Sequence, residues 1–187
     1  MLTKDGKRLD LANIGHRFQP TKEINLGDLE ALNLLDCALT ALPPWVEPLT
    51  QLQRLYLDEN FFTEFPAVLG GFQQLRLLDF SLNRIVSIGP EIGDMSELVF
   101  LDLFDNQITT LPSEIGSLSN LMYLDIMNNP IREIPREISD LTKLEVFLFD
   151  DDQVEIPSEF GYLHQLNNDV AKMDLPESIA QLLGQLW

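Results

Sequence analysis

Three adjacent carboxylates, Asp150, Asp151 and Asp152, end a run of alternating apolar residues. Side chains of this type bind hard cations, steer a basic partner, or accept hydrogen bonds within a fold. Calcium loops space their ligands so that the oxygens converge on one ion, whereas consecutive residues of an extended segment point to opposite sides. The spacing therefore favours partner steering or a structural role over a metal site.

The other side chains that could do chemistry are isolated from one another. His16 and His164 lie near opposite ends of the chain, without a neighbouring Cys or His at ligand spacing. No glycine-rich phosphate loop, Ser/His/Asp set or zinc pattern occurs. Structural histidines and a structural thiol at Cys37 are favoured over metal binding, general-base chemistry or a reactive thiol. We expect a protein that is not an enzyme, with no cofactor and no metal.

The composition indicates a folded chain with an acidic surface. At 187 residues and 45% hydrophobic content, it is long enough for one domain with a continuous core. A formal charge of −18 repels phosphate backbones and anionic lipids, which argues against nucleic acid and membrane surfaces as partners. The start has no apolar leader and the chain has a single cysteine, so we expect a cytoplasmic location.

Leucines recur at a fixed interval of 23 residues: Leu29, Leu52, Leu75, Leu98, Leu121 and Leu144. Apolar residues follow each of them three and five positions later, an alternation that predicts a short strand. A slot eight positions after each leucine holds Cys37, Asn60, Asn83, Asn106, Asn129 and Asp152. Later in each repeat, apolar pairs at i, i+3 such as Ile115 and Leu118 predict one helical or 3₁₀ turn.

This pattern, L-x-x-L-x-L-x-x-N-x-L with Leu-Pro-x-x-Ile-x-x-Leu on the return, resembles the leucine-rich repeat family. The 23-residue length is similar to that of the Ras-suppressor-type and bacterial intracellular repeat proteins. The resemblance implies an α/β-type repeat solenoid that is curved, with a concave parallel sheet of short strands, convex 3₁₀ or short-helix turns, and terminal caps. Successive repeats then stack their apolar residues into one core.

We divide this single domain into three parts. Residues 1–28 are an N-terminal cap with a degenerate first repeat, residues 29–165 are six leucine-rich repeats, and residues 166–187 are a degenerate last repeat with a C-terminal capping helix. The stretch from Asp174 to Trp187 has an acidic start, an early proline, and apolar residues at positions 179, 182, 183 and 186. It predicts an amphipathic helix that closes the solenoid.

The amide slot predicts a ladder of hydrogen bonds between neighbouring repeats. An Asn side chain both donates and accepts, so it can satisfy backbone groups of adjacent turns. Asp152 in the last such slot accepts but does not donate when ionised, which predicts a weakened ladder there. In this register Asp150 and Asp151 lie on the concave side, directly after the strand ends, as charges at the rim of a binding surface.

The family resemblance implies that partners bind the outward side chains of the concave strands. Aromatic and apolar residues there, Phe100, Phe104, Tyr123 and Met127, are expected to form an exposed patch flanked by acids. For Asp79, Asp102 and Asp125 the alternative is an ordinary solvated strand position, because Leu-Asp-Leu is common in the family. The predicted partner-binding residues are Arg54, Tyr56, Asp58, Asp79, Phe100, Asp102, Phe104, Asp105, Tyr123, Asp125, Met127, Asp150 and Asp151.

These features favour a non-catalytic protein–protein interaction module, or scaffold, that binds a protein or peptide with a basic and apolar surface. By resemblance alone, a small GTPase is one candidate partner. Two alternatives stay open. In the first, the chain is the substrate-recognition part of a larger enzyme, such as a ubiquitin ligase or kinase. In the second, it is a structural, self-associating repeat protein.

Overall fold

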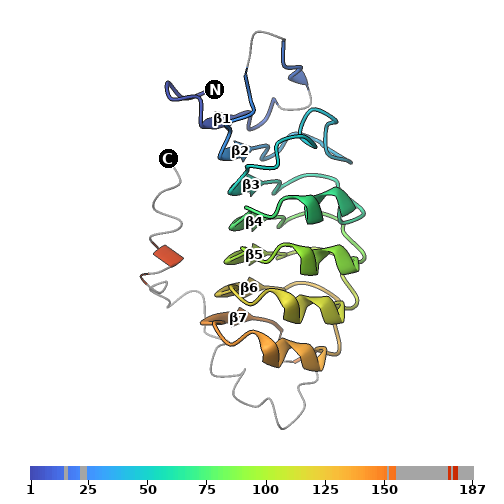
Figure 1. Cartoon of the computed structure of the whole chain (residues 1–187). Coiled ribbons are helices and arrows are strands. Elements are labelled where there is room, and N and C mark those ends of the chain that lie inside the picture. The colour runs from blue at the N-terminus through green and yellow to red at the C-terminus, as the bar shows by residue number, and fades with distance from the viewer. Residues whose placement is uncertain (15–16, 22–24, 151, 155–176, 178, 181–187) are drawn as a thin grey trace.

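The computed structural model describes residues 1–14, 17–21, 25–150, 152–154, 177 and 179–180. Short parallel strands form one sheet in chain order (Figure 1). Each strand pairs with the next at an offset of one repeat, so that Leu78 lies opposite Leu101 and Leu101 opposite Leu124. The strands are β1 (Arg8–Asp10), β2 (Ala31–Asn33), β3 (Arg54–Tyr56), β4 (Leu77–Asp79), β5 (Phe100–Asp102), β6 (Tyr123–Asp125) and β7 (Val146–Leu148).

Short 3₁₀ helices return the chain on the opposite side of the solenoid (Figure 1). They are η2 (Ala67–Gly71), η3 (Pro90–Asp94), η4 (Ser113–Ser117) and η5 (Arg136–Asp140). An extended residue precedes each of them, a proline for η2, η4 and η5 and Gly89 for η3. Both predicted elements, the strand and the 3₁₀ turn, are therefore confirmed, and together they form a solenoid with a concave sheet.

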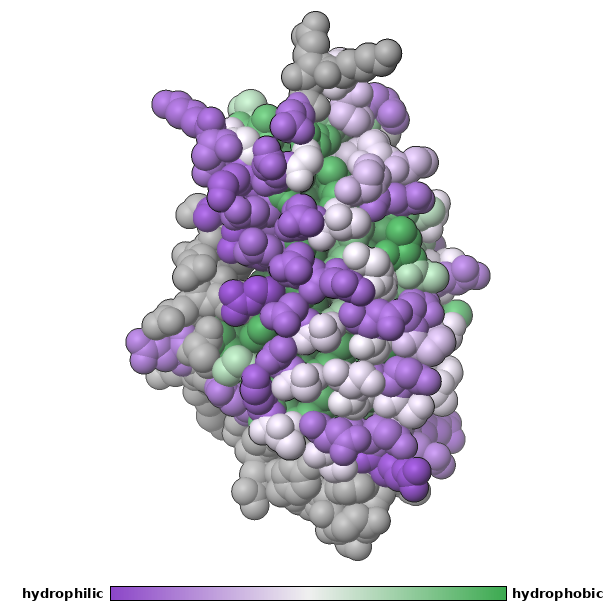
Figure 2. Space-filling model, in the orientation of Figure 1, coloured by the Kyte–Doolittle hydropathy of each residue, from purple (hydrophilic) through white to green (hydrophobic). Residues whose placement is uncertain are grey.

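The repeated apolar residues lie between the sheet and the 3₁₀ helices. The side chains of Leu55, Leu78, Leu101 and Leu124, the central residues of β3–β6, are fully buried, and so are Ile92 and Ile115 from the convex turns. They belong to one continuous apolar core that extends from Leu9 to Val154. On the face of the molecule that Figure 2 shows, hydrophilic residues predominate and hydrophobic ones are visible mainly between them.

Buried amides link each repeat to its neighbours, as predicted. Asn106 Oδ1 accepts a hydrogen bond from Ile85 N at 3.0 Å, and its Nδ2 donates to Phe80 O at 3.0 Å and to Leu103 O at 3.1 Å. Asn60, Asn83 and Asn129 make equivalent bonds. In the first slot, the buried Cys37 donates from Sγ to Leu11 O at 3.1 Å, which confirms its structural role. Asp152 in the last slot is exposed, unlike these buried residues, which is consistent with the weakened ladder predicted there.

The residue before each amide slot adopts a left-handed conformation. Its φ is between 48° and 55° at Asp36, Glu59, Leu82, Asp105 and Asn128, which are spaced by one repeat. This conformation turns the backbone sharply after the strand, and non-glycine residues adopt it only where the surroundings require it. Asp105 was predicted on the partner-binding surface, but it is an exposed residue of this turn.

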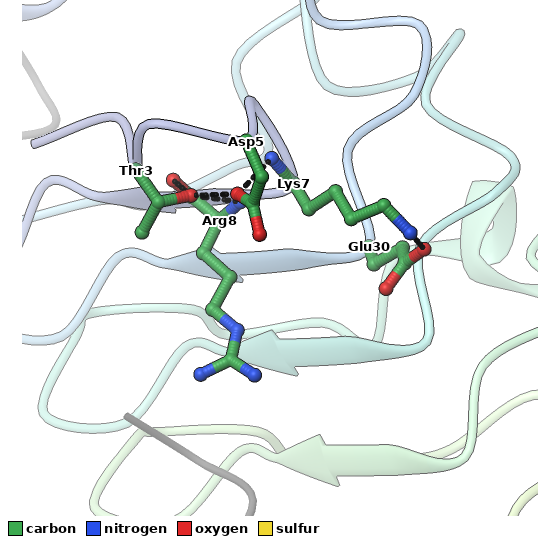
Figure 3. A network of polar contacts seen from close by, with 5 residues as sticks. All are labelled: Thr3, Asp5, Lys7, Arg8 and Glu30. Carbon is green, nitrogen blue, oxygen red and sulfur yellow. Dashed lines mark hydrogen bonds and ion pairs between the residues drawn. The ribbon is translucent and has the colours of Figure 1, made fainter.

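Residues 1–10 cover the N-terminal edge of the sheet. Leu2 forms an antiparallel bridge with Leu9 of β1, next to a hydrogen-bonded turn in which Thr3 Oγ1 donates to Asp5 Oδ1 at 2.6 Å (Figure 3). Lys7 forms an ion pair with Glu30, while the Arg8 guanidinium points away from this network. A covered edge does not present unpaired backbone groups to another chain.

The predicted closing helix falls largely outside the described residues, and so do His16, His164 and Asp151. Glu177, Ile179 and Ala180 are described and helical. They lie on the strand side of the solenoid, opposite the 3₁₀ helices (Figure 1). Within the residues that the structure describes, no helix is long and apolar enough to cross a membrane.

Candidate functional site

The parallel register places equivalent side chains of successive repeats next to one another on the concave face. The first residues of β3–β7 are Arg54, Leu77, Phe100, Tyr123 and Val146. The rings of Phe100 and Tyr123, which are paired across β5 and β6, stack with centroids 4.2 Å apart and planes within 8°. The concave sheet therefore carries a continuous apolar strip from β4 to β7.

This strip is the centre of a second apolar cluster, distinct from the solenoid core. We call it the concave apolar cluster. Tyr56, Met122 and Met127 pack against its edge. Its buried members are Leu77, Val99, Phe100, Tyr123, Val146, Leu148 and Ile179.

Two of the residues that were predicted to be exposed are buried. Phe100 is 6% exposed and Tyr123 is 7% exposed, so the expectation of an open aromatic strip is wrong for this pair. They are buried because neighbouring strands stack their rings and because Ile179, fully buried itself, belongs to the same cluster. Phe104 and Met127 remain half-buried at the side of the strip. The accessible apolar surface is thus smaller than the sequence indicates.

Carboxylates at the ends of three adjacent strands form a row beside the cluster. In this carboxylate row, Asp79, Asp102 and Asp125 lie opposite one another in the register of β4, β5 and β6. Each accepts a hydrogen bond at Oδ1 from the backbone N–H two residues later, at 3.1, 2.9 and 2.9 Å. One oxygen of each acid thus holds the turn after its strand. The alternative of an ordinary solvated strand position is wrong for Asp125, which is buried, while Asp79 and Asp102 are half-buried.

Burial beside the apolar cluster opposes ionisation of the row. Desolvation raises the pKa of Asp125 to about 6, and it raises the pKa of Asp79 and, more strongly, of Asp102, where the neighbouring acids add repulsion. Asp58, two residues after the end of β3, has a pKa raised to about 7 by burial and by the charge of Asp79. Burial likewise raises the pKa of Tyr123, whose hydroxyl lies 3.4 Å from Asp125 Oδ2. A nearby cation would therefore stabilise the ionised form of these acids.

The N-terminal half of the concave face has a different character. Arg54 is 7% exposed, and in the described part of the chain its buried Nε has no hydrogen-bond partner. Tyr56 lies half-buried two residues along β3. Beyond them, a cavity of about 510 Å³ is lined by residues of β1–β3 and the N-terminal turn, among them Arg8, Asn33 and Tyr56. Arg54 and Tyr56 nevertheless adjoin the rest of the predicted site, because in the register of β3 and β4 Arg54 lies opposite Leu77 and Tyr56 lies opposite Asp79.

The remaining predicted site residues lie at the margin of this surface. Asp150 is half-buried and accepts a hydrogen bond at Oδ2 from Asn128 N at 2.9 Å. The sequence-based prediction did not select Leu77, Val146 or Leu148, although each is a strand residue on the concave face. It assigned Ile179 to the C-terminal cap. Within the described residues, no three His, Cys, Asp or Glu side chains are grouped so that they could hold a metal ion.

The comparisons with known proteins identify the repeat. A family model described as a leucine-rich repeat region matches residues 69–187. A leucine-rich repeat protein of Leptospira interrogans is similar in structure, with 32% identity and a TM-score of 0.72 over 86% of this chain and 41% of that one. No curated protein matches the chain.

Two receptor structures from plants are also similar. One is the ectodomain of the Arabidopsis thaliana receptor kinase GASSHO1/SCHENGEN3 in complex with CASPARIAN STRIP INTEGRITY FACTOR 2, with 26% identity and a TM-score of 0.69 over 87% of this chain and 20% of that one. The other is the plant peptide hormone receptor RGFR1 in complex with RGF2, with 27% identity and a TM-score of 0.66 over 87% and 25%. The chain spans less than half the length of each of these three proteins.

Proposed function

The chain belongs to the leucine-rich repeat family, and from this premise we propose that it is a non-catalytic module that binds a protein or peptide on its concave face. The contact surface consists of the concave apolar cluster with Phe104 and Met127, flanked by the carboxylate row, Asp58 and Asp150. The partner carries apolar side chains beside Lys or Arg. A small GTPase is one candidate, and a cytoplasmic location is part of the proposal.

The observation that carries this proposal is the concave apolar cluster itself. The side chains of this cluster are separate from the solenoid core, and contiguous apolar patches on protein surfaces usually mark contacts. Ile179, which comes from beyond the last described strand, is buried in this cluster. The face therefore accommodates an inserted apolar side chain. Two of the similar receptors were solved in complex with a peptide or protein factor, which supports the same use of the fold here.

The electrostatics support a basic partner. The row and its neighbours place Asp58, Asp79, Asp102 and Asp125 beside apolar side chains, with pKa values raised mainly by burial. A Lys or Arg side chain brought to this row offsets both the desolvation and the mutual repulsion of the acids. The net charge of −18 adds long-range attraction for the same class of partner.

Peptide display against the immobilised chain tests the proposal. We expect enriched peptides to combine an apolar anchor with Lys or Arg, and a Phe104→Ala, Met127→Ala double variant to lose at least about tenfold of their affinity. Phe104 and Met127 are chosen because they are half-buried, whereas Tyr123 is buried and its loss would disturb packing.

A variant on the other side of the solenoid is the control. Glu114 in η4 and Glu137 in η5 belong to the convex turns, so a Glu114→Ala, Glu137→Ala double variant should bind the peptides as wild type does. Binding that survives loss of Phe104 and Met127, or that fails in the convex variant, would show that the concave face is not the contact surface.

One of the similar proteins favours a second candidate function. One similar structure is the ectodomain of a receptor kinase, of which the chain spans 20%. The alternative that we propose is that the chain is the recognition part of a larger enzyme. Sequencing of the gene beyond Trp187 tests this: an open frame into a catalytic domain would support it, and a stop codon there would exclude a C-terminal catalytic domain. Sedimentation tests the self-associating alternative, since a stable dimer would support it.

A further inference from the structure

The concave apolar cluster is already occupied by a residue of the same chain. Ile179 is fully buried in the cluster, although the adjacent described residues Glu177 and Ala180 are exposed. The helical segment that carries it lies on the strand side of the solenoid (Figure 1). Among the described residues of this segment, Ile179 therefore buries its side chain in a cluster formed by residues of β4–β7.

The position of Ile179 differs from that of an end cap. A cap would cover the terminal repeat of the solenoid core, whereas Ile179 is not part of that core and is grouped with Leu77 of β4 as well as with Leu148 of β7. These two residues belong to repeats that are three strands apart. Ile179 thus belongs to the cluster that we propose for a partner rather than to the solenoid core.

We propose that Ile179 is an intramolecular occupant of the partner-binding surface, which an external partner must displace. This inference rests on the proposed function and adds to it the kind of ligand. The ligand is a short helix or turn that presents one branched apolar side chain to β4–β7. The internal segment holds the face closed in the absence of such a partner.

Charge explains why an external partner can succeed. Of the described residues beside Ile179, Glu177 is acidic and Ala180 is uncharged. These residues therefore supply an apolar anchor but no cation to the carboxylate row. A partner with the same anchor and a flanking Lys or Arg gains an attraction that these residues do not offer. The occupant is thus suited to be displaced by a basic competitor.

An Ile179→Asp variant tests the contact without a partner. We expect the full chain with this change to bind the fluorescent apolar probe anilinonaphthalene sulfonate at least about threefold more strongly, because the cluster becomes accessible. Ala180→Asp adds the same charge to an exposed position of the same segment and should leave probe binding unchanged. Equal probe binding by wild type and Ile179→Asp would overturn the inference.

Binding of a display-selected peptide then separates the inference from the proposed function. We expect Ile179→Asp to raise peptide affinity by about tenfold, the gain for a face that is open about one-tenth of the time. Increased probe binding without peptide binding to either form would uphold the closed contact and overturn the partner site. Should Ile179→Asp lower the unfolding midpoint, Ile179→Ala provides the same test with a smaller change, and unchanged probe binding by that variant would count against the contact.

Discussion

At the scale of single residues, the aspartates of the carboxylate row have two roles. One oxygen of Asp79, Asp102 and Asp125 accepts the hydrogen bond that shapes the turn, and the rest of the carboxylate lies beside apolar side chains. Asn33 makes the same turn with its amide, since its Oδ1 accepts a hydrogen bond from Leu35 N at 2.9 Å. A neutral side chain therefore suffices for the turn, and the charge of the row is available for a partner.

Replacement of Asp102 by Asn should stabilise the protein at high pH. The pKa of Asp102 is raised well above 3.8 in the folded state, so the folded chain holds the proton more tightly than the unfolded chain. Its contribution to stability is complete below about pH 4 and is lost as the pH rises through the folded pKa. In urea unfolding, we expect Asp102→Asn to gain about 1–2 kcal/mol at pH 8 and little at pH 4.

The control for this prediction is Asp105→Asn. Asp105 is exposed, and its φ of 53° suits asparagine. The Asp105→Asn substitution removes the same charge at a solvent-exposed position, so its effect on the free energy of unfolding should be small at both pH values. A gain for Asp102→Asn that does not change with pH would contradict the assigned cause.

Replacement of Asn106 by Ala should destabilise the solenoid strongly. It leaves Ile85 N, Phe80 O and Leu103 O without the partner that the buried amide provides. We expect a loss of about 2–4 kcal/mol in the free energy of unfolding, because each buried polar group that loses its partner costs about 1–3 kcal/mol. The adjacent exposed Gln107→Ala should lie within about 0.5 kcal/mol of wild type. Equal effects of the two changes would refute the ladder.

At the scale of the element, each repeat stacks a 3₁₀ helix against the next with little space between them. A Cβ added to Gly116 in η4 would lie 2.5 Å from the backbone oxygen of Glu137 in η5, and one added to Gly93 in η3 would lie 3.1 Å from Glu114 O. Glycine at this position permits the close approach of neighbouring convex turns. Gly71, at the end of η2, has no such neighbour within 4 Å.

The substitution Gly116→Ala should therefore lower the stability by about 1–3 kcal/mol, as overpacking against a rigid backbone does. Gly71→Ala makes the same chemical change at an open position and should alter it by no more than about 0.5 kcal/mol. Thermal or urea unfolding of the two variants measures the difference. Similar values for both would mean that the convex turns move apart without cost.

Periodicity predicted the elements well because each repeat obeys local rules. The strands, the 3₁₀ turns, the amide ladder and the core all follow from residues at fixed offsets. The left-handed residue before each amide was not predicted, since Leu82 and Glu59 occupy it as well as Asn128. The place of Ile179 in the cluster of Phe100 and Tyr123 was not predicted either, because Ile179 is remote in sequence and lies outside the repeat register. Non-local contacts of this kind leave no periodic signal.

At the scale of the whole molecule, the fold keeps the solenoid core separate from the contact surface that we propose. The solenoid core lies between the sheet and the 3₁₀ helices, while a second apolar cluster and the acids occupy the concave face. The family and the fold are shown by the repeat match and the similar structures. The proposed contact residues are individual side chains that differ from repeat to repeat, so the repeat pattern does not determine them.

Binding of a cationic peptide should weaken as the pH falls. The carboxylates attract a cation only when they are ionised, and the pKa values of Asp58 and Asp125 are raised to about 7 and about 6. Between pH 8 and pH 5 we expect the affinity to fall by about threefold or more. A peptide with Lys and Arg replaced by Gln should change much less. Calorimetric titration at the two pH values measures both, and a rise in affinity at pH 5 would oppose the role of the row.

We propose that the concave face of this chain binds its partner. Chemical-shift mapping by NMR of the isotopically labelled chain, during titration with a display-selected peptide, locates the contact residues directly. We predict that the largest shifts occur in β4–β7 and around Phe104, Met127 and Ile179, with η2–η5 unaffected. Shifts confined to η2–η5, with β4–β7 unchanged, would contradict the claim.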